Sequence, residues 1–217
     1  LTRLYSAEAF AALGVLNAVV SAFGPAAAGR LDVAAAVHKD AADRNKLSAS
    51  GFWLAAVCCI ALGLIFNEIY RLGVLSDKFQ QYIEIGVIGP LAIFVFTCVQ
   101  IGRYSANGRG DFSLLGISAL LMAVSFFAIS LLFWTLNWVA FGLIAALLVS
   151  QSLVALFLFQ RSNLFPSLLI TRRHLTLVYQ NRSFPLYNAT STLLDGITVA
   201  MPLFFLMSHY SVEDVAL

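Results

Sequence analysis

The sequence has little charge for its length. Only 11% of its 217 residues are Asp, Glu, Lys or Arg, whereas a soluble domain usually carries about 25%. The net charge is only +2, which argues against the basic surface that binds nucleic acid. Hydrophobic residues make up 60% of the chain, more than a soluble fold of this size can hide from water. The composition therefore excludes an ordinary soluble domain and predicts an integral membrane protein.

Motifs of metal and redox sites are also missing. The sequence contains neither CxxC nor HExxH. Its three cysteines all lie in apolar runs, at Cys58, Cys59 and Cys98. Its three histidines fall in predicted loops, at His38, His174 and His209. None of them has a carboxylate and a nucleophile at suitable spacing, so we expect no metal ion, no cofactor and no enzymatic activity.

What the chain does have is long apolar runs. A helix needs about 20 mostly apolar residues to cross the roughly 30 Å of hydrocarbon in a bilayer. Strands of a membrane barrel would be about 10 residues long and would alternate polar with apolar side chains. We therefore predict an all-α, polytopic bundle of transmembrane helices. Six runs qualify: Phe10–Val37, Leu47–Ile69, Tyr82–Gly102, Phe112–Trp134, Trp138–Phe159 and Leu186–Met207.

Basic residues divide unevenly between the two ends of these predicted helices. One side, with connectors at residues 38–46, 103–111 and 160–184, carries nine lysines and arginines, and the other side carries three. The positive-inside rule places the richer side in the cytoplasm and both chain ends outside. Arginines on the inner side can meet anionic lipid or a phosphate, although topology alone explains them equally well. Four such arginines are Arg103, Arg109, Arg172 and Arg173.

Segments at the two ends of the sequence resemble each other. Leu1–Ala12 reads LTRLYSAEAFAA and Leu206–Leu217 reads LMSHYSVEDVAL, with five of twelve positions identical. In each segment a serine is placed to cap a new helix, and a glutamate falls in its first turn, where it favours the helix dipole. The match indicates either a shared helix-start signal or a six-helix unit that begins again. Duplicated halves are common in transporters.

Three segments carry a resemblance to a known family. They read RLYSAEAFAALGVL, GRLDVAAAVHKDAADRNKL and SFPLYNATSTLLDGITVAMPLFFLMSHYSVEDVAL. The chain resembles the bacterial polysaccharide flippases of the multidrug/oligosaccharidyl-lipid/polysaccharide exporter superfamily. The family's Arg-Leu-Tyr-Ser/Thr-x-Glu block, its Arg-x-Glu/Asp stretch and its Lys-Asp turn match Arg3–Phe10, Gly29–Asp32 and Lys39–Asp40. Ala11 stands where the family usually has Gly.

The resemblance implies a place for the chain in a longer protein. The proteins of this family have two lobes and about twelve helices in total. The chain would cover the end of the first helix through the seventh helix. Residues 1–184 would form an N-terminal lobe that lacks most of its first helix. Residues 185–217 would supply the first helix of a C-terminal lobe. Further hydrophobic segments are then expected after Leu217.

The resemblance also implies a function. These flippases move polyprenyl-diphosphate-linked oligosaccharide, the repeat units of lipopolysaccharide O-antigen, capsule or exopolysaccharide, across the bacterial inner membrane by alternating access. The implied partners are this substrate, membrane lipid, a polysaccharide polymerase and chain-length proteins. Alternatives are a cation-coupled multidrug antiporter, which would have an acid-lined cavity, and a membrane glycosyltransferase or polymerase, which would need a large extramembrane loop. A membrane scaffold without transport is a further alternative, which charges inside the helices disfavour.

Arg30 and Asp32 are the first candidates for function, because charge inside a membrane is costly unless it faces a cavity or a partner. Arg30 can offer a permanent, planar cation to a diphosphate, or it can extend to the nearby interface. Asp32 lies about 200° further round a helix, so it should not pair with Arg30; it faces either another helix or the interface. Pro25, just before them, predicts a kink.

Asp195 is the third candidate, because it lies midway along the last predicted helix and no base on that helix neutralises it. We assign it a hypothetical role in gating or in coupling to protons or sodium ions. The alternative is a buried acid, hydrogen-bonded or protonated, beside Gly196. Pro202 in the same segment favours the kind of helix break that transporters use.

Overall fold

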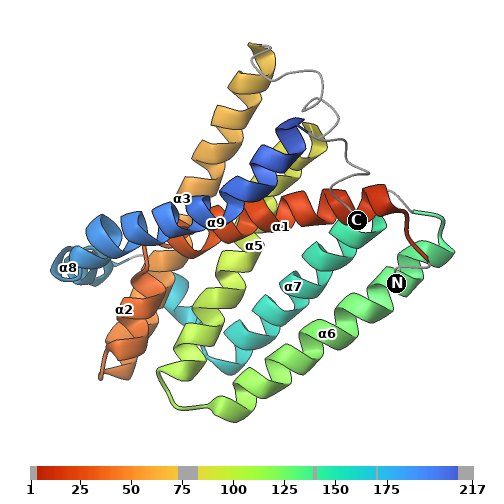
Figure 1. Cartoon of the computed structure of the whole chain (residues 1–217). Helices are drawn as coiled ribbons and strands as arrows, with labels where there is room; N and C mark the ends of the chain where they lie inside the picture. Colours follow the sequence, from red (N-terminus) through yellow and green to blue (C-terminus); the bar gives the residue numbers. More distant parts are fainter. Residues whose placement is uncertain (1–3, 73–82, 139–140, 170, 210–217) are drawn as a thin grey trace.

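The computed structural model describes residues 4–72, 83–138, 141–169 and 171–209. These ranges fold into helices, and none of them contains a strand (Figure 1). Five helices are long and apolar enough to cross a membrane: Glu8–Ala27, Ala41–Glu68, Ile88–Asn107, Phe112–Thr135 and Gly142–Arg161. The predicted all-α polytopic bundle is confirmed, and the chain is a multi-pass membrane protein.

The first predicted transmembrane helix is in fact two helices. α1 (Ala7–Ala27) is followed by α2 (Leu31–Val37). Between them, Gly29 and Arg30 have φ angles of +60° and +56°. Left-handed residues end a helix because the next N–H groups bond back to the last carbonyls. Pro25 lies within α1, two residues before its end, so the chain breaks after the proline. The prediction of one continuous helix is therefore wrong at this break.

Four long helices follow and agree with the predicted apolar runs, although two of them are longer than the runs that predicted them. They are α3 (Ala41–Arg71), α5 (Ile83–Asn107), α6 (Phe112–Thr135) and α7 (Gly142–Arg161). α3 begins six residues before the predicted Leu47, because the polar segment in front of it forms its first turns. Asp43 lies in the first turn of α3, where a negative charge favours the helix dipole. The connector before α3, predicted at residues 38–46, therefore contains only residues 38–40.

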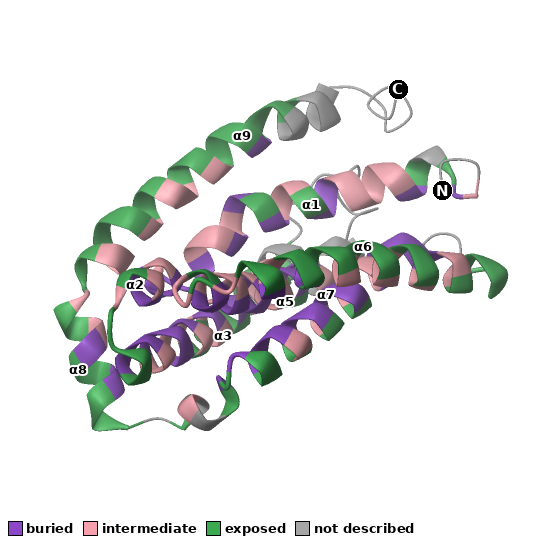
Figure 2. Cartoon of the chain, turned by 90° about the horizontal axis from the view of Figure 1, so that it is seen from below, coloured by how far each residue is buried: buried purple, intermediate pink, exposed green. Residues whose placement is uncertain are grey.

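The core lies where α1, α3, α5 and α7 meet. Leu16, Ala55, Ile93 and Ile144 are buried there, one from each helix. The outward faces of α3 and α6 carry exposed apolar side chains, and the green colouring of α6 in Figure 2 shows this exposure. Exposed apolar bands of this size belong in lipid rather than in water. Six residues more than half exposed on these two faces are Val57, Ile60, Leu64, Leu120, Val124 and Phe127.

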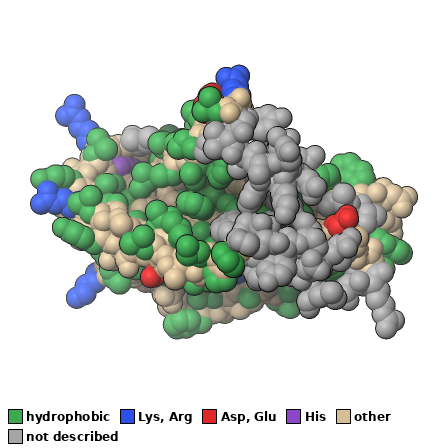
Figure 3. Space-filling view, turned by 45° about the horizontal axis from the view of Figure 1, so that its top comes forward, with side chains coloured by type: hydrophobic (Ala, Val, Ile, Leu, Met, Phe, Trp, Pro, Cys, Tyr) green, Lys and Arg blue, Asp and Glu red, His purple; other side chains and the backbone are tan. Residues whose placement is uncertain are grey.

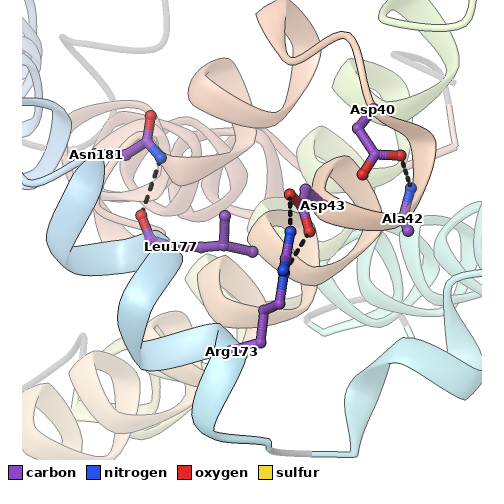
Figure 4. Close-up of polar contacts among 6 residues, drawn as sticks. All are labelled: Asp40, Ala42, Asp43, Arg173, Leu177 and Asn181. Carbon is purple, nitrogen blue, oxygen red and sulfur yellow. Dashed lines mark hydrogen bonds and ion pairs between the residues drawn. The ribbon is translucent and has the colours of Figure 1, made fainter.

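The connector after α7, predicted as a loop, contains a short 3-10 turn, η1 (Phe165–Leu168), and the amphipathic helix α8 (Arg172–Gln180). Leu177 of α8 is buried in a cluster formed by residues of α2 and α3. His174 lies within α8, so its predicted position in a loop is wrong. Its side chain is also buried. Its Nδ1 lies 3.1 Å from the backbone N of Thr171 and caps α8. Figure 4 shows α8 held against α3 by polar contacts as well.

A π-helical turn, η2 (Phe184–Asn188), leads into the last helix, α9 (Ala189–His209). α9 is the sixth predicted helix, and it packs along α1 (Figure 1). A Cβ added to Gly196 would lie only 2.7 Å from Cα of Ala22. Backbones that approach this closely through small residues are typical of helix pairs in membranes. That α9 opens a second lobe stays a prediction.

Candidate functional site

Arg30 lies at the break between α1 and α2. Its own backbone is left-handed, so it belongs to neither helix. Its side chain is half-buried, and its guanidinium carbon lies 5.9 Å from the ring centroid of Tyr104 on α5. A cation at this distance from an aromatic face is attracted by it. The described ion pairs do not include Arg30. The bundle therefore holds a permanent cation beside an aromatic ring, and no ion pair joins this cation to a described acid.

Asp32, two residues after Arg30, is buried within the protein. Its side chain is 2% exposed, and its Oδ1 has no hydrogen-bond partner in the part of the chain that the structure describes. No ion pair joins Asp32 to Arg30, as predicted, although the predicted angle does not apply because the helix is broken at Arg30. The interface alternative for Asp32 is wrong, because the side chain is buried against neighbouring helices.

Two glycines bring α3 and α5 close to α2 around Asp32. A Cβ added to Gly51 of α3 would lie 3.5 Å from Cβ of Leu31, and one added to Gly108, directly after α5, would lie 2.9 Å from Cα of Ala36. Leu31 directly precedes Asp32, and Ala36 follows it by one helical turn. The Asp32 side chain therefore lies at the junction of three helices.

Two serines, one on α3 and one on α5, are also buried and also have a side-chain oxygen without a hydrogen-bond partner among the described residues. Ser48 lies one turn before Gly51 on α3, and Ser105 lies one turn before Gly108 on α5. Ser48 is 1% exposed and Ser105 is fully buried, and neither hydroxyl has a partner among the described residues. Buried oxygens of this kind usually bind water or an ion. The described residues contain no group of three or more His, Cys, Asp and Glu side chains that could hold a metal ion.

Asp195 is not brought together with the other two candidates. Its side chain is exposed on α9, so the alternative of a buried acid is wrong. Pro185, at the start of η2, lies beside the break: a Cβ added to Gly29 would be 3.2 Å from its Cβ. Asp195 follows Pro185 by ten residues, which places it roughly 15 Å along the helix from the break. Arg30 and Asp195 therefore cannot hold one small ligand between them in this arrangement.

Residues of the first motif have structural roles at the start of α1. Ser6 caps α1 by accepting a hydrogen bond from the backbone N of Ala9 at 3.3 Å, and Glu8 lies in the first turn, both as predicted. Tyr5 is buried, and its hydroxyl donates to the backbone carbonyl of Ser130 on α6. Tyr210, Ser211 and Glu213 of the second copy lie outside the described residues. The motif therefore anchors α1 to α6.

The three connectors that carry most of the basic residues meet at one end of the bundle through arginine side chains. Nη1 of Arg44 donates to the carbonyl oxygen of Gly108 at 2.9 Å. Nη2 of Arg109 donates to Oγ of Ser162 at 2.6 Å. Burial lowers the pKa of Arg109, and the nearby charge of Arg44 lowers this pKa further. Figure 3 shows Lys and Arg side chains gathered at one end of the face in view.

Sequence reasoning missed most partners in this region. Tyr104, Ser48 and Ser105 are ordinary residues of apolar helices, and no local pattern distinguishes them. They gain significance only because α2, α3 and α5 pack together. Gly29 did carry a signal, since a glycine after an alanine run is typical of a helix end.

The chain matches no family model, no curated protein and no solved structure. The resemblance to the polysaccharide flippases therefore depends on the motifs of the sequence. Family membership and the substrate class stay predictions.

Proposed function

We propose that this protein is a transporter that translocates polyprenyl-diphosphate-linked oligosaccharide across the bacterial inner membrane by alternating access. The observation that supports the proposal is Arg30, a half-buried cation at a helix break with no acid paired to it in the described part of the chain. Broken helices provide substrate sites in many transporters. The planar donors of an arginine match phosphate oxygens, and its charge does not titrate in the physiological range.

In this proposal, Arg30 holds the diphosphate while the protein changes between its two open states. The ring of Tyr104, 5.9 Å from the guanidinium carbon, limits the orientations that Arg30 adopts. The sugar passes through the polar interior, and the lipid tail stays in the bilayer along the exposed apolar faces. No bond is formed or broken. Arg30 should bind the diphosphate less tightly in the state that opens to the outside, because binding that is equally tight in both states does not favour release.

The test uses a bacterial strain that lacks the gene, complemented with wild type, Arg30→Gly, Arg30→Lys or Arg71→Gln. Glycine accepts the φ of +56° at residue 30, so Arg30→Gly removes the charge without straining the backbone. Arg71 is an exposed residue paired with Glu68 at the opposite end of α3, which makes Arg71→Gln a matched control for loss of a positive charge.

We expect lipid-linked repeat units to accumulate in the cytoplasmic leaflet without the gene. Wild type and Arg71→Gln should clear them, Arg30→Gly should not, and Arg30→Lys should clear them partly. An unchanged lipid-linked pool together with normal surface polysaccharide would rule out the proposed function.

A cation-coupled multidrug antiporter is a second candidate, and Asp32 favours it. A buried carboxylate oxygen without a partner is suited to binding a proton or a small cation. The antiporter predicts that Asp32→Asn abolishes cation-dependent drug efflux and that loss of the gene leaves the lipid-linked sugar pool unchanged. The two candidates therefore give opposite results in the same strains.

A further inference from the structure

Two arginines at the inner end of the bundle lie close together, although they are far apart in the sequence. Arg44 in the first turns of α3 is only 8% exposed. It donates to the carbonyl of Gly108, the residue directly before Arg109. Arg109 is half-buried, and the charge of Arg44 contributes to the lowered pKa of Arg109. Two like charges are therefore held beside each other at partly buried positions.

Each of these arginines retains a buried donor that the protein does not use. The Nε atoms of Arg44 and Arg109 have no hydrogen-bond partner among the described residues. Nη1 of Arg44 donates to the carbonyl of Gly108, and the two Nη atoms of Arg109 donate to Ser162 and to the carbonyl of Arg161. A buried cationic donor without an acceptor is costly, so an external acceptor would stabilise this arrangement.

No nearby acid supplies that acceptor. Asp43, next to Arg44 in the chain, forms its ion pair with Arg173. Asp111 accepts hydrogen bonds from the backbone N of Leu114 and from Ser113. Within the described ranges, neither Arg44 nor Arg109 has a carboxylate oxygen within 4.0 Å. The charge of Asp111 does act on Arg109, but neither arginine forms an ion pair with a described acid.

We propose that Arg44 and Arg109 form a binding site for a phosphate group at the inner end of the bundle. The guanidinium groups would donate to phosphate oxygens, and the negative charge would offset the repulsion between the two cations. The phosphate belongs either to the headgroup of an anionic lipid or to a soluble phosphate or diphosphate. This site is separate from Arg30 and does not depend on the proposed transport function.

The test measures binding to the purified full chain in detergent. One arm adds phosphatidylglycerol and counts bound lipid by native mass spectrometry. The other arm titrates sodium pyrophosphate by calorimetry at constant ionic strength. Variants are Arg109→Gln, Arg44→Gln and Arg44→Lys, and the control is Arg172→Gln, an exposed arginine on α8.

We expect wild type to bind at least one of the two probes, and the arm that responds identifies the source of the phosphate. Arg109→Gln and Arg44→Gln should each weaken binding by about tenfold or more, because each loses a charged donor. Arg172→Gln should stay within about twofold of wild type, as expected for a screened surface charge.

Arg44→Gln also loses the bond to Gly108, so its helical content is checked by circular dichroism. Arg44→Lys keeps a charge and should retain more binding than Arg44→Gln. The proposal is overturned if wild type binds neither probe. It is also overturned if folded Arg109→Gln loses no more affinity than Arg172→Gln.

Discussion

Arg173 on α8 and Asp43 in the first turn of α3 form a two-pronged ion pair across 130 positions of the chain (Figure 4). Nε and Nη2 of the arginine donate to the two carboxylate oxygens at 2.9 and 2.7 Å. On the same helix, Leu177 packs onto Leu31 and Leu47. A polar and an apolar contact therefore fix α8 against α2 and the start of α3.

This pair predicts that Asp43→Asn loosens α8 without unfolding the protein. The substitution keeps the size of the side chain and removes the charge that Arg173 requires, so amides of α8 should exchange with deuterium severalfold faster, and those of α5 should not change. Glu68→Gln, which removes the exposed pair with Arg71 at the other end of α3, is the control. Unchanged exchange in α8 would show that Leu177 alone holds this helix.

The left-handed backbone at Arg30 predicts an unusual order of stability among its variants. A residue with a Cβ at φ +56° is less stable than glycine there, by about 1 kcal/mol. Arg30→Gly should therefore be more stable than Arg30→Ala, although both variants lose the same charge. Unfolding in detergent with increasing dodecyl sulfate measures the difference. Equal stability of the two variants would contradict a left-handed residue 30.

The contact of Gly196 with Ala22 predicts that α9 does not tolerate a methyl group at this position. The new Cβ of Gly196→Ala would lie 2.6 Å from the carbonyl oxygen of Ala22, so the helices must separate, at a cost of about 1–3 kcal/mol. Gly14→Ala in α1 is the matched control, because nothing lies within 4 Å of its added Cβ. That control should be neutral or stabilising, by up to about 1 kcal/mol. Equal unfolding midpoints would mean that α9 does not pack on α1.

The sequence predicted the helices well because the thickness of a membrane fixes how long an apolar run must be. It failed where short-range geometry decides the outcome. The break at Gly29 and Arg30 interrupts a segment that stays apolar on both sides. α8 was missed because a helix of nine residues with basic residues at its start reads as a polar loop, and only its docking onto Leu31 and Leu47 stabilises it.

The candidate site could be predicted only in part for a related reason. Arg30, Asp32 and Asp195 stand out because each places a charge in an apolar run. Their surroundings depend on contacts between distant segments, such as Arg30 with Tyr104, which a single sequence does not reveal. The pairing of Arg44 with the segment of Arg109, 64 positions away, is of the same kind.

Asp111, the N-cap of α6, predicts how the stability of the inner end depends on pH. Its carboxylate accepts hydrogen bonds from the backbone N of Leu114 at 3.1 Å and from Ser113 at 2.9 Å, and these bonds hold its pKa below the ordinary value of 3.8. Because the folded state favours the ionised form, the contribution of Asp111 is fully present above pH 3.8. It is lost as the pH falls from there through the lower pKa of the folded protein.

Asp111→Asn separates the charge from the cap, since asparagine caps a helix about as well as aspartate but does not titrate. The thermal midpoint of wild type should fall more steeply than that of Asp111→Asn as the pH is lowered from 5 to about 3. The difference between the two proteins isolates Asp111 from the other carboxylates, which titrate in both. Two parallel pH profiles would mean that Asp111 is not bonded to the start of α6 in the folded protein, and the loop that carries Arg109 would then need a different anchor.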